Sequence, residues 1–541
     1  MRRRSNTCTL TCSCTCSLTC TLTLTALLLT ACASSPPPAA PPATPVAAVQ
    51  VQYENVPGQA AAKAKPPVEY WAGRTDLFRA PAPPKPAELV LPPVQRFTLK
   101  NGLQVIVVSR KELPVVSFGI AVQAGGYDED HDTLGVSDFV AAMLRRGTKT
   151  RSADDISHAI DFVGGTLDAQ ATNESTTAAC SALSKDAKLC LDLLSDMLLH
   201  PAFPESEMGE VRDEMLAAVA ARFDNPHELA NAHFANLMFG EKHPDGWELA
   251  ADDVRKITRA RLETFWRTFY HPNRAILAVA GDVDVAKLRA GVEKAFGAWT
   301  RATVPARPAW TIPELAATRI MLVDRPDSTQ ATIVLGHQGI KHSDPRWYAA
   351  TLMNYVLGGS DFASRLMTEV RAKRGLTYGI GSSFGSTLYE GTFRVAGSTK
   401  SESTWEALLA SVNEIRRMKA EGPTAAELEK AKGYYAGSYP FKLQTAAGVA
   451  QALVAAELHG LGAAYVRELP LRLAAVDLAA AKAAAAELLH PDTMQVVIVG
   501  KAAAIEPQIK DKGIAYEKIH FKDPISSAAR EAAKTAKPAK P

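Results

Sequence analysis

The chain has 541 residues, of which 47% are hydrophobic and 22% are charged, and its formal net charge is +3. This composition is typical of a globular protein with material for several folded units, and 60 basic against 57 acidic residues is too balanced for a protein that reads a nucleic-acid polyanion. Beyond the N-terminal segment there is no run of about 18 apolar residues, so the sequence predicts no internal membrane span.

The first 32 residues have the pattern of a bacterial export signal. Three arginines at positions 2–4 precede a run rich in Leu and Thr, and the run ends in Leu-Thr-Ala-Cys at 29–32. These four residues resemble the lipobox of bacterial lipoproteins, so we expect Cys32 to be lipidated and to anchor the chain in a membrane. Ala33, and not an aspartate, follows the cysteine, which in such lipoproteins favours the outer membrane over the inner membrane. We therefore expect the chain to lie on the periplasmic side of the outer membrane. The alternative is an ordinary secretory signal that is cleaved near Ala33.

Low-complexity segments lie at both ends of the remaining chain. Residues 33–95 hold 15 of the 34 prolines together with many alanines, a composition typical of extended, semi-rigid linkers. We therefore predict a tether over 33–95 and, from its Ala, Lys and Pro content, a disordered tail over 524–541. The folded part is expected to have two regions, 96–303 and 304–523.

The folded part opens with strands and continues with helices. Residues 97–108 predict a strand, an Asn-Gly turn and a second strand, and the apolar run at 115–122 predicts a third. Further elements predicted in the first region are helices at 135–146, 153–163, 186–199, 205–223 and 227–239 and an apolar strand at 275–280.

The folded part contains an internal repeat. The His-Pro motif and apolar strand at 271–281 have a counterpart at 490–500, and a helix with acidic residues precedes both copies. A Pro-rich joint at 304–313 separates the copies. Strands followed by blocks of helices predict two α+β halves, with helices packed on one face of each sheet.

Only two cysteines, Cys180 and Cys190, remain in the folded part, because the other six lie in or at the end of the export signal. We expect two separate buried thiols, with a disulfide in an oxidising periplasm as the alternative. The mature chain has no Cys-x-x-Cys spacing and therefore no predicted cysteine metal site.

The order and spacing of several short motifs resemble the pitrilysin/insulinase metallopeptidases, which include the mitochondrial processing peptidases, over roughly residues 95–520. The motifs lie at 99–103, 125–129, 134–137, 147–148, 270–274, 281–283, 358–360, 364–366 and 369–378. The resemblance implies two homologous α/β-roll halves, each a mostly antiparallel sheet with helices on one face.

The chemistry of this family depends on an inverted zincin motif, His-x-x-Glu-His, in which two histidines bind zinc and the glutamate activates water. In this chain Asp138 and Ala142 stand where the family has its histidines, and Ala141 stands where it has the glutamate. Glu207 and Glu214 keep the seven-residue step of a later acidic helix, and Glu214 matches the third zinc ligand. Because two carboxylates would hold zinc weakly, we expect no metal on this chain.

The alternative zinc ligands are His227 and His233. They are six residues apart, about 600° of helix turn, which places them on opposite faces of a helix. The family resemblance implies a surface helix at this place, so we expect both to be solvated side chains.

The second region carries Arg371 and Tyr378, which are seven residues apart. In the resembled family an Arg and a Tyr with this spacing reach the zinc site of the other half, where they hydrogen-bond the substrate and stabilise charge at the scissile carbonyl. The alternative is a helix-surface charge and a core strand residue.

Taken together, the chain has the Arg/Tyr pair and lacks the zinc motif. The resemblance therefore implies a non-catalytic, substrate-binding subunit of a zinc metalloendopeptidase, inactive alone, whose partner chain carries the zinc and whose ligand is a peptide. Two other hypotheses remain: a peptide-binding or assembly module of the cell envelope, and a self-sufficient zinc peptidase with atypical ligands.

Overall fold

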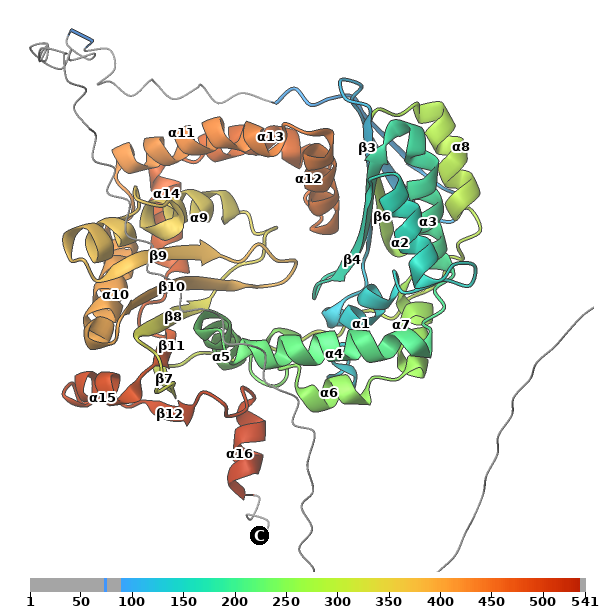
Figure 1. The fold of residues 1–541 in the computed structure, drawn as a ribbon. Helices are drawn as coiled ribbons and strands as arrows, with labels where there is room; N and C mark the ends of the chain where they lie inside the picture. The colour runs from blue at the N-terminus through green and yellow to red at the C-terminus, as the bar shows by residue number, and fades with distance from the viewer. Residues whose placement is uncertain (1–72, 75–88, 536–541) are drawn as a thin grey trace, which may run out of the picture. The chain divides into compact units, whose positions relative to one another are not determined.

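Two six-stranded sheets organise the folded part of the chain (Figure 1). The computed structural model describes residues 73–74 and 89–535, so the predicted export signal, Cys32 and most of the predicted tether lie outside the described residues. The first sheet contains β1 (Val94–Thr98), β2 (Gln104–Ser109), β3 (Val115–Val122), β4 (Thr166–Ala171), β5 (Thr176–Leu183) and β6 (Ala275–Gly281). The second contains β7 (Arg319–Asp324), β8 (Gln330–Gln338), β9 (Thr377–Phe384), β10 (Thr392–Lys400), β11 (Gln495–Gly500) and β12 (Glu517–His520).

The two sheets have corresponding topologies. Their strand orders are β1-β2-β6-β3-β5-β4 and β12-β7-β11-β8-β10-β9. Four of the five neighbouring pairs in the first sheet are antiparallel. Three of the five are antiparallel in the second sheet. The predicted fold class, two homologous halves with mostly antiparallel sheets, is confirmed.

Each half adds a block of helices to its sheet. The first half has α1 (Val136–Met143), α2 (Ala153–Phe162), α3 (Ala187–Leu199), α4 (Glu205–Arg222), α5 (Pro226–Phe239), α6 (Ala251–Lys256), α7 (Arg259–Phe269) and α8 (Val285–Phe296). The second has α9 (Trp347–Asn354), the π-helical η7 (Tyr355–Gly359) and η8 (Met367–Lys373), α10 (Thr404–Glu421), α11 (Ala425–Lys442), α12 (Ala446–Leu458), α13 (Tyr465–Ala474), α14 (Leu478–Leu488), α15 (Ala502–Lys510) and α16 (Ser527–Thr535). None of the helices within 73–74 and 89–535 has the length and apolarity needed to cross a membrane.

The predicted elements of the first half agree with these bounds to within three residues. The agreement has a physical basis in the sequence pattern. Strand β6, for example, is buried at all seven positions, and a strand covered on both faces reads as a continuous apolar run.

The two halves exchange one helix each. Helix α12 of the second half covers the face of the first sheet that its own helices leave open. Val449 and Leu453 of α12 belong to one buried cluster with Ile106, Val108 and Ile276 of strands β2 and β6. This apolar face is therefore completed by residues more than 170 positions away along the chain.

The reciprocal contact is made by helix α5 of the first half. Its Leu229, Phe234 and Met238 share a buried cluster with Val334 and Val497 of strands β8 and β11. Each sheet is thus covered on one face by helices of its own half and on the other by a helix of the opposite half, so neither half buries its sheet alone.

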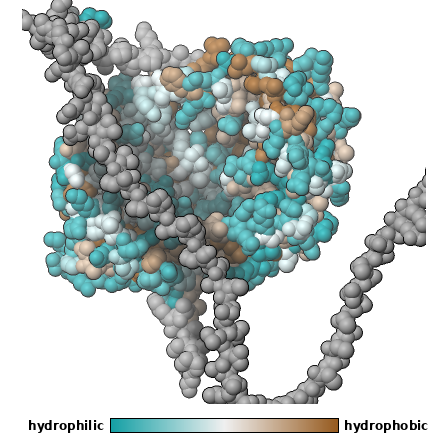
Figure 2. Space-filling view, viewed as in Figure 1, coloured by the Kyte–Doolittle hydropathy of each residue, from teal (hydrophilic) through white to brown (hydrophobic). Residues whose placement is uncertain are grey.

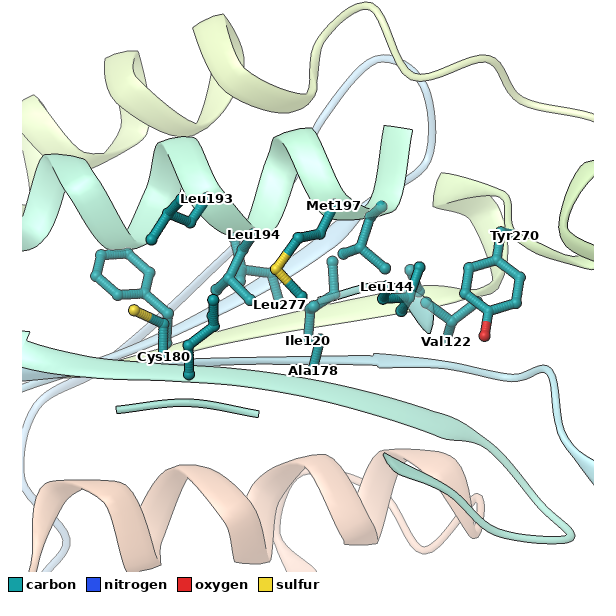
Figure 3. Close-up of a cluster of buried hydrophobic side chains, with 14 of the residues drawn as sticks. Ile120, Val122, Leu144, Ala178, Cys180, Leu193, Leu194, Met197, Tyr270 and Leu277 are labelled. Atoms are coloured by element: carbon teal, nitrogen blue, oxygen red, sulfur yellow. The ribbon is translucent and has the colours of Figure 1, made fainter. Parts of the chain in front are cut away.

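The core of the first half lies between its sheet and helix α3 (Figure 3). Met197 of α3 packs toward Ile120 of the sheet, and Leu193 lies on the side of Cys180. Cys180 on β5 and Cys190 on α3 form a disulfide, with their Cα atoms 5.5 Å apart and both side chains fully buried. The expectation of two separate thiols is therefore wrong. The reason is local: β5 leads through one short turn into α3, which folds back over it.

The C-terminal segment differs from the prediction of a disordered tail over 524–541. Ile525 is buried in the cluster around α5, and the N–H groups of Ile525 and Ser526 donate to the Glu248 carboxylate at 2.8 and 2.9 Å. Helix α16 follows. The prediction is wrong over these described residues, because Glu248 lies about 280 positions earlier and composition does not reveal such a contact.

His337, in strand β8, is a buried histidine that is held neutral. Its Nδ1 donates to the Gln338 carbonyl at 2.7 Å, and its Nε2 accepts the His490 N–H at 3.0 Å. Protonation would remove that acceptor. Desolvation by burial lowers the pKa of His337 to about 3.

We expect His337 to make the protein acid-sensitive. In the unfolded chain this histidine binds a proton below about pH 6.5, whereas in the folded chain it stays neutral down to about pH 3, so stability falls as the pH falls through this window. The loss is about 1.4 kcal/mol per pH unit, or roughly 2 kcal/mol between pH 6.5 and 5. Urea unfolding at pH 7.5 and 5.0 should show a smaller drop for His337→Gln than for the wild type. The same substitution at the exposed His158 is the control, and equal pH dependence in wild type and His337→Gln would contradict the assignment.

Candidate functional site

A buried carboxylate holds the start of helix α1. Glu129, 8% exposed, accepts hydrogen bonds from the N–H groups of Gly135 at 2.9 Å and Ser137 at 2.5 Å. Desolvation raises the pKa of Glu129 to about 7 although these hydrogen bonds lower it. Gly135 has a positive φ of 81°, and a Cβ there would lie 2.8 Å from Leu249, so this entry to the helix requires glycine. Glu129 lies inside one of the sequence motifs, but its role in positioning α1 could not be read from the sequence.

Helix α1 carries the positions of the expected zinc motif. The Asp138 side chain is exposed, but surrounding protein atoms raise its pKa by desolvation. Ala141 is 1% exposed and Ala142 is half-buried. A methyl group can neither donate an electron pair to a metal nor accept a proton, so this face of α1 offers one carboxylate as its chemistry.

The acidic side chains of helix α4 form ion pairs with an arginine. Arg146, just beyond α1, lies 2.9 Å from Glu214, 3.0 Å from Glu210 and 3.9 Å from Glu207. All four side chains are at least one fifth exposed, so each ion pair contributes modestly. The two glutamates singled out in the sequence are therefore brought together, and their shared counter-charge is a guanidinium.

These residues do not fit a zinc ion. Zinc sites take three or four His, Cys or carboxylate donors, and here Asp138 replaces one of the two expected histidine ligands and the methyl group of Ala142 replaces the other. Glu214, the expected third ligand, is bonded to Arg146. Within 73–74 and 89–535 there is no group of three or more His, Cys, Asp and Glu that could hold a metal ion.

Arg371 and Tyr378 lie together, as their predicted joint role requires. Arg371 is on η8 and Tyr378 on strand β9, and the guanidinium carbon lies 5.4 Å from the centre of the Tyr378 ring. Phe362 flanks the guanidinium more closely, with its ring centre 4.4 Å away. Tyr378 is 90% exposed and Phe362 70% exposed, so the predicted alternative of a core tyrosine is wrong. Phe362 was missed because nothing in the sequence marks an exposed phenylalanine.

Arg371 differs from the other cations of its segment. Arg365 is bonded to Glu427, whereas Lys373 and Arg374 are both bonded to Glu369. Across the described part of the chain, no carboxylate pairs with Arg371, and its ring neighbours are aromatic. Its charge is therefore available to a ligand.

The pair and helix α1 belong to different halves. Among the described residues, no hydrogen bond or ion pair joins Arg371 or Tyr378 to Asp138. The structure thus brings Arg371 to Tyr378 and Arg146 to the acidic face of α4, but it does not bring these two clusters into contact.

The alternative zinc ligands on helix α5 are also apart. His227 is exposed, with its Nε2 3.2 Å from the Ser398 hydroxyl, whereas His233 is 1% exposed. The expectation that both are solvated is wrong for His233. Desolvation, with a smaller effect from Arg530, lowers the pKa of His233 to about 3. The cause is the packing of α5 between the second sheet and the segment around Ile525.

The two halves also meet at the β4–β5 loop. The Glu174 carboxylate accepts the Leu388 N–H at 2.7 Å and lies 2.9 Å from His459 Nε2. Figure 2, viewed from the same side as Figure 1, shows a face of the molecule that is hollowed in its middle. A cavity of about 860 Å³ beside Glu174 is lined by polar residues of both halves, among them Gln123, Asn273, Arg274, Arg307 and Tyr389.

Comparison with known proteins gives matches over both halves. Residues 104–244 match the family described as insulinase (peptidase family M16), and residues 256–435 match the peptidase M16 inactive domain. An uncharacterized zinc protease of Streptomyces coelicolor is 31% identical over 402 residues, which cover 73% of this chain and 87% of that protein. An uncharacterized zinc protease of Mycobacterium tuberculosis is 31% identical over 386 residues, covering 70% and 86%.

Solved structures agree. A peptidase M16 inactive domain from Pseudomonas fluorescens has a TM-score of 0.70 at 27% identity and covers 75% of this chain and 98% of that chain. A protease from Helicobacter pylori, at 20% identity and a TM-score of 0.69, covers 76% of this chain and 100% of that chain and shows the likeness of fold alone. The resemblance inferred from the sequence motifs is confirmed. This chain belongs to the insulinase (M16) family of peptidases.

Proposed function

We propose that this chain is a non-catalytic, substrate-binding subunit of a zinc metalloendopeptidase and completes the active site of a zinc-bearing partner chain. The observation that carries the proposal is Arg371, a guanidinium without a carboxylate partner among the described residues, whose carbon lies 4.4 and 5.4 Å from the centres of two exposed aromatic rings. A fixed cation beside the Tyr378 phenol suits an oxygen that gains negative charge. The methyl groups of Ala141 and Ala142 support the other part of the proposal, since this chain has no base of its own at that place.

An extended peptide has a place to bind on the same chain. Strand β4 is one of the two outer strands of the first sheet, the other being β1, so one side of its backbone has no strand partner in the sheet. A peptide that adds to this edge gains main-chain hydrogen bonds with little demand on its sequence. We propose this edge as the peptide-binding strand.

The proposal is tested with a partner chain that carries an intact His-x-x-Glu-His motif. Zinc-dependent cleavage of a quenched fluorescent peptide is expected only after mixing the two chains. Arg371→Ala and Tyr378→Phe are each expected to lower turnover about 100-fold, which corresponds to roughly 2.7 kcal/mol of barrier. Matched controls are Arg374→Ala, whose arginine is paired with Glu369, and Tyr434→Phe on helix α11.

Two results would contradict the proposal. Chelator-sensitive cleavage by the purified chain alone, or near-stoichiometric zinc in it, would favour the self-sufficient peptidase with atypical ligands. Unchanged turnover in both site variants would favour a peptide-binding or assembly module of the cell envelope.

We also propose a place in the cell envelope, anchored through Cys32 on the periplasmic side of the outer membrane. The buried Cys180–Cys190 disulfide supports the proposal, because disulfides persist in oxidising compartments such as the bacterial periplasm. The lipobox-like residues at 29–32 support the anchor itself.

A further inference from the structure

We infer that Phe362 is a positioning residue that holds the Arg371 guanidinium in place for its ligand. The inference rests on the proposed function of Arg371 and Tyr378 and extends it by a residue that no sequence motif marks. Its basis is the combination of a fixed backbone, an exposed ring and a close approach of that ring to a cation with no carboxylate partner among the described residues.

The backbone around Phe362 is fixed on both sides. Before it, the Ser360 N–H and hydroxyl both donate to the Tyr355 carbonyl, at 3.2 and 3.0 Å. After it, the Ser364 N–H and hydroxyl both donate to the Asp361 carbonyl, at 3.2 and 3.1 Å. Ser360 and Ser364 are themselves buried. The turn that carries Phe362 is therefore held from within the protein.

The loop that leads into this turn is packed against strand β9. A Cβ at Gly358 would lie 2.5 Å from the Ser382 hydroxyl and 2.7 Å from the Ser382 N–H nitrogen, so no side chain fits there. Asn354 adds two hydrogen bonds to Ser382, at 2.7 and 3.1 Å. The turn therefore moves with the strand that carries Tyr378, and the two aromatic residues keep a common frame.

Phe362 is 70% exposed although its backbone is fixed. An exposed aromatic ring loses the stabilisation that burial would give, and this ring has its centre 4.4 Å from the Arg371 guanidinium carbon. An arginine side chain has several rotatable bonds, and a cation with no carboxylate partner would sample many rotamers. The ring of Phe362 restricts Arg371 to one of them, and no side-chain hydrogen bond from Arg371 occurs within the described part of the chain.

A double-mutant cycle in the partnered complex tests the inference, with a quenched fluorescent peptide as the probe. Phe362→Ala is expected to lower kcat/KM about fivefold when Arg371 is present and to have almost no effect in the Arg371→Ala background. Phe362→Trp should retain activity to within about twofold, whereas Phe362→Leu should behave like alanine, because only an aromatic face attracts the cation. Phe162→Ala, a 93% exposed phenylalanine on helix α2, is the control. Equal losses in both backgrounds, or full rescue by leucine, would overturn the inference.

A second measurement needs no partner chain. The rate at which phenylglyoxal modifies Arg371, followed by mass spectrometry of the purified protein, should rise about threefold in Phe362→Ala and stay unchanged in Phe162→Ala. An unchanged rate at Arg371 in Phe362→Ala would overturn the stacking role. Failure of the proposed function is distinguishable, because it would appear as full turnover in Arg371→Ala with this protection intact.

Discussion

Residues 89–303 produced alone are expected to aggregate or to remain without a cooperative fold, and residues 304–535 are expected to do the same. Without helix α12, the first fragment exposes Ile106, Val108 and Ile276, each at most 5% exposed in the whole chain. At about 1.5–3 kcal/mol per buried aliphatic side chain, these three residues alone account for roughly 5–9 kcal/mol. That is comparable with the whole stability of a typical domain, about 5–15 kcal/mol.

The same contacts predict recovery when the fragments are produced together. Co-expression should yield a soluble complex, seen as one peak in size-exclusion chromatography and one cooperative unfolding transition. As a control, a protease site inserted at the exposed Ala316 should allow cleavage of the folded chain without separating its halves. A soluble, monomeric, cooperatively unfolding 89–303 fragment would contradict the exchange of α5 and α12 as the basis of the fold.

A variant with Asp138→His, Ala141→Glu and Ala142→His is expected to gain zinc affinity by at least about 100-fold over the wild type, because two imidazoles one turn apart supply what one carboxylate does not. Competition with a chromophoric chelator measures the affinity, and elemental analysis measures the stoichiometry. Arg146 competes for Glu214 in this variant, since its guanidinium lies 2.9 Å from that carboxylate. The gain should therefore increase further when Arg146→Ala is added.

Circular dichroism must show that the triple variant is folded, because position 141 is buried. Adding Glu214→Ala is expected to lower the affinity again by about tenfold or more if this residue is the third ligand. A folded triple variant that takes up no zinc would contradict the placement of positions 138–142 at the family's metal-binding helix.

Phe362 and Arg146 show what kind of site residue a sequence leaves unmarked. Arg371 and Tyr378 could be predicted because they lie seven residues apart inside one recognisable motif. Phe362 is nine positions from Arg371, in a turn whose shape depends on bonds to Tyr355 and Asp361. Arg146 meets Glu214 across 68 positions, through the packing of two helices. Neither contact has a local signature.

The sequence by itself determined strands β1–β3 and β6 and helices α1–α5 of the first half, but not its β4, β5 and α6–α8. It also determined the duplication, the family resemblance and the loss of the zinc motif. Each of these depends on residue types within a short window, where periodicity and spacing act directly on the backbone. The tertiary structure alone decided the exchange of α5 and α12, the Cys180–Cys190 disulfide, the burial of His233 and the docking of α16. The disulfide joins residues only 10 positions apart, but it depends on how α3 folds back over β5. The other features arise from apolar and polar contacts between residues far apart in the chain, and the free energy of such contacts depends on three-dimensional packing rather than on neighbouring sequence.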